Sequence, residues 1–308
     1  MSKRKKSQQK SHRSFSPRTA RTSAKTTEKP AVKTNRTALP RDDMPRKSCW
    51  LYGRHAVLSA LSNRDRRCLR LQMLSSVYKS CKNELMHLAG MRADFVDIEI
   101  VEREQLDASL PDNVTHQGIA AEFSNLPAVH IEDICQQCSE LNHAIVIVLD
   151  QVTDPRNIGA VLRSAAAFGA RAVIIQDRHG PGPDHMGALA KAASGALETV
   201  KLVRVTNLQR AMKTLQHDGF WCVGLTGNAT ESLPDAGIEG KTAVIMGSEG
   251  DGLRRLVEQS CDRLVKIPMT PDMESLNISN ACAITLYELS RQQFSSRPQT
   301  RSGIREKE

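Results

Sequence analysis

Short apolar runs recur through the second half of the chain, and segments with helical periodicity separate them. The apolar runs are typical of buried strands and lie at 145–149, 172–175, 201–205, 221–225, 243–246 and 264–267. The helical segments lie at 158–168, 188–197, 208–216, 253–259 and 278–294. Apolar strands that alternate with helices indicate a mostly parallel sheet with helices on both faces. We therefore predict an α/β fold for residues 144–296.

The first half of the chain has a different pattern and predicts a smaller α/β domain at 49–125. Order begins near Trp50, and the segment 52–58 leads into a helix that ends at Leu61. Strands are predicted at 69–73, 95–101 and 118–123, and helices at 78–90 and 105–110. Residues 126–143 contain Pro127, mix polar and apolar positions and lack a strong period. These residues are predicted to link the two domains.

Positive charge is concentrated in the first 48 residues. They hold 15 Lys and Arg against 3 Asp and Glu, whereas the rest of the chain holds 28 basic and 31 acidic residues. The basic segment is nearly free of large apolar side chains and cannot bury enough surface to offset its ordering entropy. We predict disordered tails at 1–48 and 297–308. The basic tail could engage RNA phosphates, act as a solubilising extension or be an organelle transit peptide.

Apolar run lengths and cysteine content exclude several classes of protein. The longest apolar run, 144–149, is far shorter than the ~20 residues that span a bilayer, so an integral membrane protein is not expected. Eight cysteines in 308 residues are too few for a disulfide scaffold, and no apolar signal-peptide segment is present. A reducing, cytoplasmic location is expected. Cys135 and Cys138 form a lone C-x-x-C pair without two further ligands at matching spacing, so no metal site is expected.

Ligands of open parallel sheets bind at the carboxyl ends of the strands, so the loops there are informative. The loop after the first strand of the large domain lacks G-x-G-x-x-G, and the chain has no G-x-x-x-x-G-K-[ST] segment. The absence of these motifs weighs against NAD, ATP or GTP as the ligand. A glycine-rich loop, 247–252, follows the fifth strand, and a loop rich in Ser and Asn, 268–280, follows the sixth. Taken alone, each loop could be an ordinary turn or a helix cap.

Three motifs occupy these loops. They read Asn157-x-Gly159-x-x-x-Arg163, then Gly247-Ser248-Glu249-Gly250-Asp251-Gly252-Leu253, then Ile267-Pro268-Met269 followed by Ser275-Leu276-Asn277-Ile278-Ser279. Together, in this order and spacing, they resemble the motifs of the SpoU (TrmH) family of RNA ribose 2′-O-methyltransferases. The upstream segment Tyr52-Gly53-Arg54-His55-Ala56-Val57 resembles the start of the family's small RNA-binding domain. The resemblance therefore covers roughly residues 50–294.

The resemblance implies a fold and a cofactor. Family members have a SPOUT α/β domain with a C-terminal trefoil knot, and an L30e-like small domain binds substrate RNA. S-adenosyl-L-methionine binds in the knot loops, where Gly247, Ile267 and Leu276 match cofactor-binding positions. Thr226 and Gly227, after the fourth strand, are expected to line the same pocket. Family members are homodimers whose active site is completed across the interface.

The resemblance also assigns catalytic positions. A ribose 2′-OH must lose its proton as it attacks the methyl group, and the phosphates beside it need a cation. Arg163 matches the first-motif arginine, for which deprotonation and electrostatic positioning of phosphate are both open roles. Asn157 matches the residue that supports this arginine and the ribose, and Glu249 matches the acid that orients the arginine. Ser275 and Asn277 match third-motif positions around cofactor and substrate.

The predicted function is S-adenosylmethionine-dependent methylation of a ribose 2′-OH in RNA. The two-domain layout resembles family members that act on a guanosine of 23S rRNA, so 23S rRNA is the expected partner. Two alternatives remain open at this point. One is a tRNA ribose 2′-O-methyltransferase, and the other is a non-catalytic RNA-binding protein of ribosome assembly that retains the fold.

Overall fold

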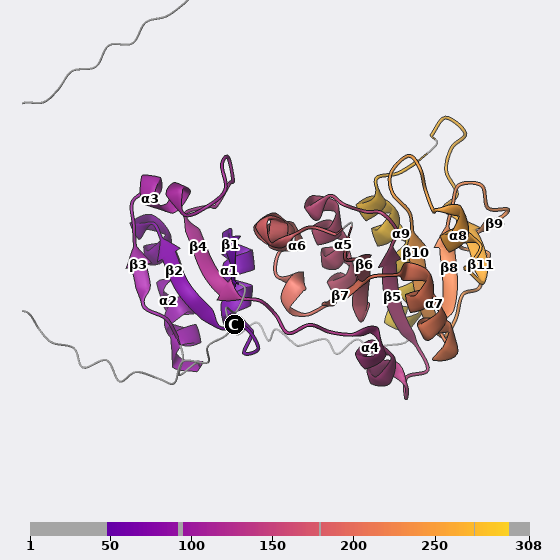
Figure 1. Cartoon of the computed structure of the whole chain (residues 1–308), viewed down its shortest axis with the longest axis horizontal. Coiled ribbons are helices and arrows are strands. Elements are labelled where there is room, and N and C mark those ends of the chain that lie inside the picture. The colour runs from indigo at the N-terminus through magenta and orange to yellow at the C-terminus, as the bar shows by residue number, and fades with distance from the viewer. Residues whose placement is uncertain (1–47, 92–94, 179, 274, 296–308) are drawn as a thin grey trace, which may run out of the picture. The chain divides into compact units, whose positions relative to one another are not determined.

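The computed structural model in Figure 1 describes residues 48–91, 95–178, 180–273 and 275–295. The two predicted tails lie outside the described residues, except that Ser48 is the first residue of a strand. Within the described part of the chain, two separate sheets form, one before and one after residue 130. None of the helices in these ranges is both long and apolar enough to cross a membrane.

The small domain is built on a four-stranded sheet with the order β1-β4-β2-β3. Strand β4 is antiparallel to both of its neighbours, whereas β2 and β3 are parallel. The strands are β1 (Ser48–Tyr52), β2 (Cys68–Met73), β3 (Ile98–Ile100) and β4 (Ile119–Ser124). The helices are α1 (Arg54–Ser62), α2 (Ser75–Met91) and α3 (Arg103–Ala108).

The large domain contains a seven-stranded sheet with the order β7-β6-β5-β10-β8-β11-β9, and every pair in it is parallel. The strands are β5 (Ala144–Leu149), β6 (Ala172–Gln176), β7 (Lys201–Val205), β8 (Trp221–Leu225), β9 (Glu231–Ser232), β10 (Lys241–Met246) and β11 (Arg263–Lys266). The helices are α4 (Ile131–Cys138), α5 (Pro155–Ala167), α6 (Met186–Ala193), α7 (Leu208–His217), α8 (Arg255–Glu258) and α9 (Ile278–Ser295), with short 3-10 helices η1 (Pro183–His185) and η2 (Ala196–Glu198). The predicted mostly parallel α/β fold is confirmed.

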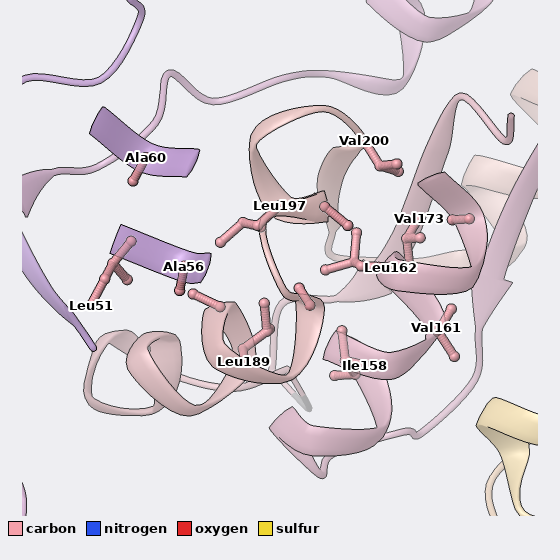
Figure 2. Close-up of a cluster of buried hydrophobic side chains, with 14 of the residues drawn as sticks. Leu51, Ala56, Ala60, Ile158, Val161, Leu162, Val173, Leu189, Leu197 and Val200 are labelled. Atoms are coloured by element: carbon pink, nitrogen blue, oxygen red, sulfur yellow. The ribbon is translucent and has the colours of Figure 1, made fainter. Parts of the chain in front are cut away.

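The buried side chains of β5 show why this sheet needs helices on both faces. All six residues of the strand are buried. Ile145, Ile147 and Leu149 belong to the core shared with α5, α6 and α9, whereas Val146 and Val148 belong to the core shared with α4, α7 and α8. Because successive side chains of a strand point to opposite faces, a continuous apolar run is stable only when both faces are covered. Figure 2 shows the first core, with residues of α5 and α6 packed together.

Several elements differ from the prediction, and the two-residue strand β9, for example, was not expected. Strand β1 was not expected, because only five residues form it and its burial alternates weakly. Helix α4 lies inside the predicted linker, where Ile134 and Cys138 are fully buried against the sheet. The helix predicted over 188–197 ends at Ala193, because Ser194 and Gly195 adopt left-handed backbone conformations with φ of 53° and 94°. Left-handed residues terminate a helix, and the chain continues as η2.

Candidate functional site

The first motif is positioned by the start of α5. Asp154 precedes the helix, and its side chain accepts a hydrogen bond from the backbone N–H of Arg156 at 2.9 Å. Pro155 occupies the first helical position, where a missing N–H costs nothing. This start places Asn157 in the first turn of α5, beside the loop that follows β10. Arg163 lies six residues further along the same helix.

The predicted cofactor-binding residues all line one cavity of about 370 Å³ at the carboxyl ends of β8, β10 and β11. They are Gly247, Ile267, Leu276, Thr226 and Gly227. The predicted catalytic residues Glu249 and Ser275 line the same cavity. The volume lies within the range of about 300–1,000 Å³ that is common for small-molecule sites. One small-molecule pocket therefore joins residues from three separate loops.

The lining of this cavity is acidic and partly apolar. Glu249, Asp251 and Glu258 contribute carboxylates, and Met246, Leu225 and Ile278 are among the apolar side chains. Among the described residues that line it, none is Lys, Arg or His. An acidic wall without basic groups attracts a cationic ligand and repels phosphate groups.

The glycine-rich loop folds back on itself at the mouth of the cavity. A Cβ atom on Gly247 would lie 2.0 Å from the carbonyl carbon of Gly252 and 2.4 Å from the backbone nitrogen of Leu253. The backbone N–H of Gly252 donates to the Ser248 carbonyl at 3.1 Å. Glycine at 247 is thus required by the close approach of two backbone segments.

One residue from each motif meets at a polar cluster beside the cavity. A carboxylate oxygen of Glu249 accepts hydrogen bonds from the side-chain N–H groups of Asn277 at 2.5 Å and Asn157 at 3.4 Å. Asn277 also donates to the side-chain oxygen of Asn157 at 3.2 Å. The three residues are separated by up to 120 positions in the sequence, yet they form one connected group. We call Asn157, Glu249 and Asn277 the polar triangle.

Asn277 also anchors the start of α9. Its side-chain oxygen accepts from the backbone N–H of Ser279 at 2.9 Å and from the Ser279 hydroxyl at 2.6 Å. This is the hydrogen bonding of an N-cap residue, which satisfies a donor that the first turn leaves unpaired. A single side chain therefore fixes both the helix start and the carboxylate of Glu249.

A second connection between the loops was not predicted from the sequence. Asp150, directly after β5, is fully buried, and its carboxylate accepts from the backbone N–H of Arg254 at 3.0 Å and from its Nε at 2.8 Å. Arg254 also donates to the side chain of Gln176 at 3.1 Å. Because Arg254 follows the glycine-rich loop, this ion pair holds the end of that loop against β5 and β6. A lone aspartate after an apolar strand was the only sequence signal.

Arg163 does not join the polar triangle. It is exposed, and it makes no hydrogen bond or ion pair with any residue in the ranges that the structure describes. Six residues of α-helix separate Arg163 from Asn157 by roughly 9 Å along the axis and about 120° around it. The guanidinium group is therefore presented to solvent, within a helix whose other faces pack against α6 and α9.

The C-x-x-C pair lies far from this cavity, on α4. Cys135 and Cys138 are both buried in the core that covers the other face of the sheet. Burial, together with the neighbouring carboxylate of Asp218, raises the pKa of Cys135 to about 12. Metal binding needs thiolates, which this environment disfavours. No group of three or more potential metal ligands occurs among the described residues.

Comparison with known proteins places the chain in a family. Residues 144–287 match the model of the SpoU rRNA Methylase family, and residues 50–128 match the model for RNA 2′-O ribose methyltransferase substrate binding. The 23S rRNA (guanosine-2′-O-)-methyltransferase RlmB of Vibrio cholerae is 38% identical over an alignment of 252 residues that covers 80% of this chain and 98% of that protein. The protein of the same name from Escherichia coli K12 is 38% identical over 79% of this chain and 98% of its own length.

Solved structures agree on the fold. The SpoU methyltransferase AviRb from Streptomyces viridochromogenes, in complex with AdoMet, has a TM-score of 0.63 at 24% identity and covers 80% of this chain and 91% of its own. An AdoMet-bound rRNA methyltransferase from Sinorhizobium meliloti has a TM-score of 0.63 at 20% identity, covering 80% and 87%. The motifs, the fold and the two family matches lead to one conclusion: the chain belongs to the SpoU family of rRNA methylases.

Proposed function

We propose that the protein transfers a methyl group from S-adenosyl-L-methionine to the ribose 2′-OH of a guanosine in 23S rRNA. The observation that carries the proposal is the acidic, glycine-rich cavity with the polar triangle at its edge. The curated relatives with 38% identity along almost their whole length support the choice of RNA and nucleoside.

The cavity suits this cofactor in charge and in shape. When bound, S-adenosylmethionine supplies an electrophilic methyl group on a sulfonium ion. The carboxylates of Glu249, Asp251 and Glu258 favour a ligand that carries sulfonium and ammonium charges. Apolar side chains such as Ile267 and Leu276 suit the face of an adenine ring, and the loop backbone at Gly247 and Gly227 leaves room for it.

The chain's own residues then act on the RNA. Arg163 binds a phosphate next to the target ribose, because an arginine remains protonated at neutral pH and pairs well with phosphate. Asn157 supports the ribose from the first turn of α5. Glu249 is held in place by both asparagines and aligns the polar groups at the mouth of the cavity. Ser275 faces cofactor and substrate from the third motif.

The proposal includes a homodimer whose partner completes the site. The exposed position of Arg163, without a carboxylate partner in the described residues, supports a role in a site of the second subunit. Ile284 and Tyr287 expose 43% and 54% of their surface on α9, and the Tyr287 ring contacts Phe168 just after α5 at 6.2 Å between centroids. Contiguous exposed apolar patches are typical of an interface, and these two side chains lie three positions apart on α9, about one helical turn.

The remaining parts of the proposal concern architecture and location. The L30e-like small domain, 49–125, binds substrate RNA, residues 126–143 link it to the SPOUT domain at 144–296, and the protein acts in the cytoplasm. The segment after β10 forms the family's trefoil knot. The bond between Glu249 in that segment and Asn277 before α9 supports the knot, because it joins the two parts of the chain that a knot would bring together.

A methyl-transfer assay tests the proposed function. The full-length protein is incubated with labelled S-adenosylmethionine and, separately, unmodified 23S rRNA, 16S rRNA and tRNA, and the nucleosides are then separated. Label in 2′-O-methylguanosine from 23S rRNA alone is the expected result. Label only in tRNA would mean that the substrate is tRNA and not 23S rRNA. Absence of both label and cofactor binding would favour a non-catalytic RNA-binding protein.

The polar triangle gives a separate prediction. Asn277→Ala removes the N-cap of α9 and the strongest contact to Glu249, so both stability and activity should fall. Loss of an N-cap costs about 1 kcal/mol, which lowers the Tm by roughly 2–4 °C in a domain of this size. Methyl transfer should drop at least about tenfold in kcat/KM, because the carboxylate of Glu249 loses its orientation.

Asn207→Ala is the matched control for Asn277→Ala. Asn207 caps α7, where its side-chain oxygen accepts from the backbone N–H of Arg210 at 3.1 Å, away from the cavity. The Asn207→Ala substitution should lower the Tm by a similar amount and leave kcat/KM unchanged. Equal activity losses in the two variants would mean that the effect comes from stability alone, and the polar triangle would have no catalytic part.

A further inference from the structure

The small domain packs directly on the helical layer of the large domain. Strand β1 and helix α1 contact α6, and Leu51, Ala56 and Ala60 share one buried cluster with Leu189 and Leu197 (Figure 2). Two glycines of the large domain allow this approach. A Cβ atom on Gly187 would lie 2.4 Å from the ring of Tyr52, and one on Gly195 would lie 2.3 Å from the hydroxyl of Ser59.

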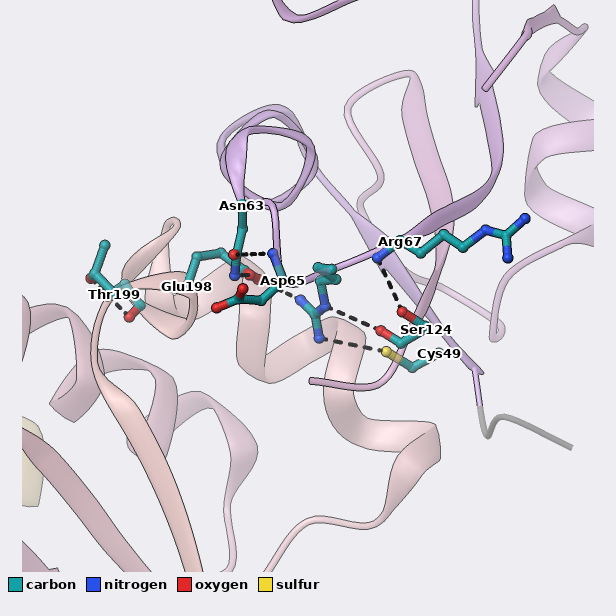
Figure 3. Close-up of polar contacts among 9 residues, drawn as sticks. Cys49, Asn63, Asp65, Arg67, Ser124, Glu198 and Thr199 are labelled. Carbon is teal, nitrogen blue, oxygen red and sulfur yellow. Dashed lines mark hydrogen bonds and ion pairs between the residues drawn. The ribbon is translucent and has the colours of Figure 1, made fainter. Parts of the chain in front are cut away.

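A buried ion pair crosses the same contact. Arg66, between α1 and β2, is 1% exposed, and the side chain of Glu198 in η2 is 6% exposed. The guanidinium of Arg66 donates to one carboxylate oxygen of Glu198, and the side-chain N–H of Asn63 donates to the other oxygen at 2.7 Å (Figure 3). Two donors of the small domain therefore hold both oxygens of one carboxylate in the large domain.

Both partners are held firmly on their own side. The Nε of Arg66 donates to the carbonyl of Ser124 at 3.4 Å, and the guanidinium lies 5.6 Å from the ring centroid of the buried Phe123. Glu198 belongs to a 3-10 turn that Gly195 begins, and its backbone N–H donates to the Gly195 carbonyl at 3.0 Å. The guanidinium of Arg66 cannot turn away without breaking its side-chain contacts, and the backbone from which the Glu198 side chain extends is fixed by the 3-10 turn, so the pair has a defined direction as well as a defined distance.

Apolar packing alone would not need this arrangement. Removing two charges from water is costly, and a buried pair often stabilises a protein no better than apolar side chains of the same size. A pair with defined geometry does, however, penalise every other docking position, because sliding the two domains would leave a buried charge unpaired. The pair is therefore suited to fix one orientation of the small domain.

We propose that Glu198, bound by Arg66 and Asn63, is a positioning residue that docks the small domain on the large domain in one orientation, so that RNA held by the small domain reaches the cavity correctly. This inference rests on the proposed function, because it assigns the small domain to the RNA substrate. Glu198 itself touches neither the cavity nor the polar triangle among the described contacts.

The test uses Glu198→Gln in the full-length protein, since this change removes the charge and keeps the size. The KM for RNA should rise at least about tenfold, because misplacement of a substrate by about 1 Å is sufficient for large losses. The Kd for S-adenosylmethionine should stay at the wild-type value. Amide hydrogen exchange should become faster in α1 and α6, which form the contact, and remain slow in β5 and β10.

Two further variants make the result specific. Glu231→Gln removes the carboxylate of an ion pair with Arg263 that lies wholly within the large domain, and it should leave the KM for RNA unchanged. The double variant Arg66→Met/Glu198→Met replaces the charges with apolar side chains of similar volume. It should restore slow exchange in α1 and α6, because the apolar pair stabilises the contact, but the KM for RNA should stay raised, because two methionines do not penalise other docking positions.

The outcomes separate this inference from the proposed function. An unchanged KM for RNA and unchanged exchange in Glu198→Gln would overturn the inference, as would faster exchange throughout both sheets, which indicates a merely structural role. If the wild-type protein bound cofactor but methylated no RNA, the proposed function would fail. The exchange data would then still report whether Glu198 fixes the docking of the small domain.

Discussion

Arg163→Ala should reduce methyl transfer by at least about 10²–10³-fold, because removal of one preorganised hydrogen-bond donor from a transition state typically costs that much. The fold should survive. Arg163 is exposed on α5 and makes no hydrogen bond or ion pair with the residues that the structure describes, so its removal leaves no buried partner unsatisfied. The Tm and the Kd for S-adenosylmethionine should both match the wild type, and single-turnover methylation of 23S rRNA measures the loss.

Arg210→Ala is the control for this substitution. Arg210 is also an exposed arginine on a helix, but it lies on α7, which covers the opposite face of the sheet. The Arg210→Ala substitution removes the same charge from the protein and should leave the rate of methyl transfer unchanged. If Arg163→Ala retained wild-type activity, the assignment of the first motif to RNA phosphate would be wrong.

Subunit mixing shows whether Arg163 acts on its own site or on that of the partner. Arg163→Ala and Gly247→Ala subunits, each inactive alone, are unfolded and refolded together. If Arg163 serves the partner's site, a mixed dimer carries both defects in one site and leaves the other site intact. Random pairing should then restore about one quarter of wild-type activity. No recovery would place Arg163 in the site of its own subunit.

The large domain could be predicted closely because its central strands are largely apolar runs. Strands β7 and β8 begin and end at the predicted residues, and β5 extends its prediction by one residue. A parallel strand buried on both faces has few polar positions, so its limits are visible in the sequence. The edge strand β7 is less apolar, because it includes Lys201 and Arg204. The small domain offers weaker signals. Strand β3 has three residues, none of them fully buried, and seven were predicted.

The residues of the candidate site also fall into those that the sequence could predict and those that it could not. The five candidate cofactor-binding residues were predicted from the resemblance to the SpoU family, whose motifs occupy loops that follow strands, and all five line one cavity. The polar triangle could not be predicted as a unit. Glu249 lies 92 positions from Asn157, and only the folded backbone decides which amide reaches its carboxylate. The same holds for Asp150 with Arg254 and for Glu198 with Arg66, whose partners are more than 100 positions away.

Gly247→Ala should abolish cofactor binding. The new Cβ atom would lie 2.0 Å from the backbone of Gly252, a distance at which one of the two segments must move. The obstacle is backbone and not the end of a flexible side chain, so the loop over 247–252 must open. This opening displaces Ser248 and Glu249 from the cavity wall and strains the ion pair between Asp150 and Arg254. The Kd for S-adenosylmethionine, measured by calorimetry, should rise at least about a hundredfold.

The control for Gly247→Ala is the same substitution at a glycine with free space around it. Gly90 lies in α2, and no atom comes within 4 Å of its added Cβ. Because alanine favours a helix over glycine by about 1 kcal/mol, Gly90→Ala should raise the Tm slightly and leave the Kd unchanged. Circular dichroism of Gly247→Ala must still show both helices and strands for its binding loss to be local. A wild-type Kd in that variant would mean that the cavity beside the glycine-rich loop is not where the cofactor binds.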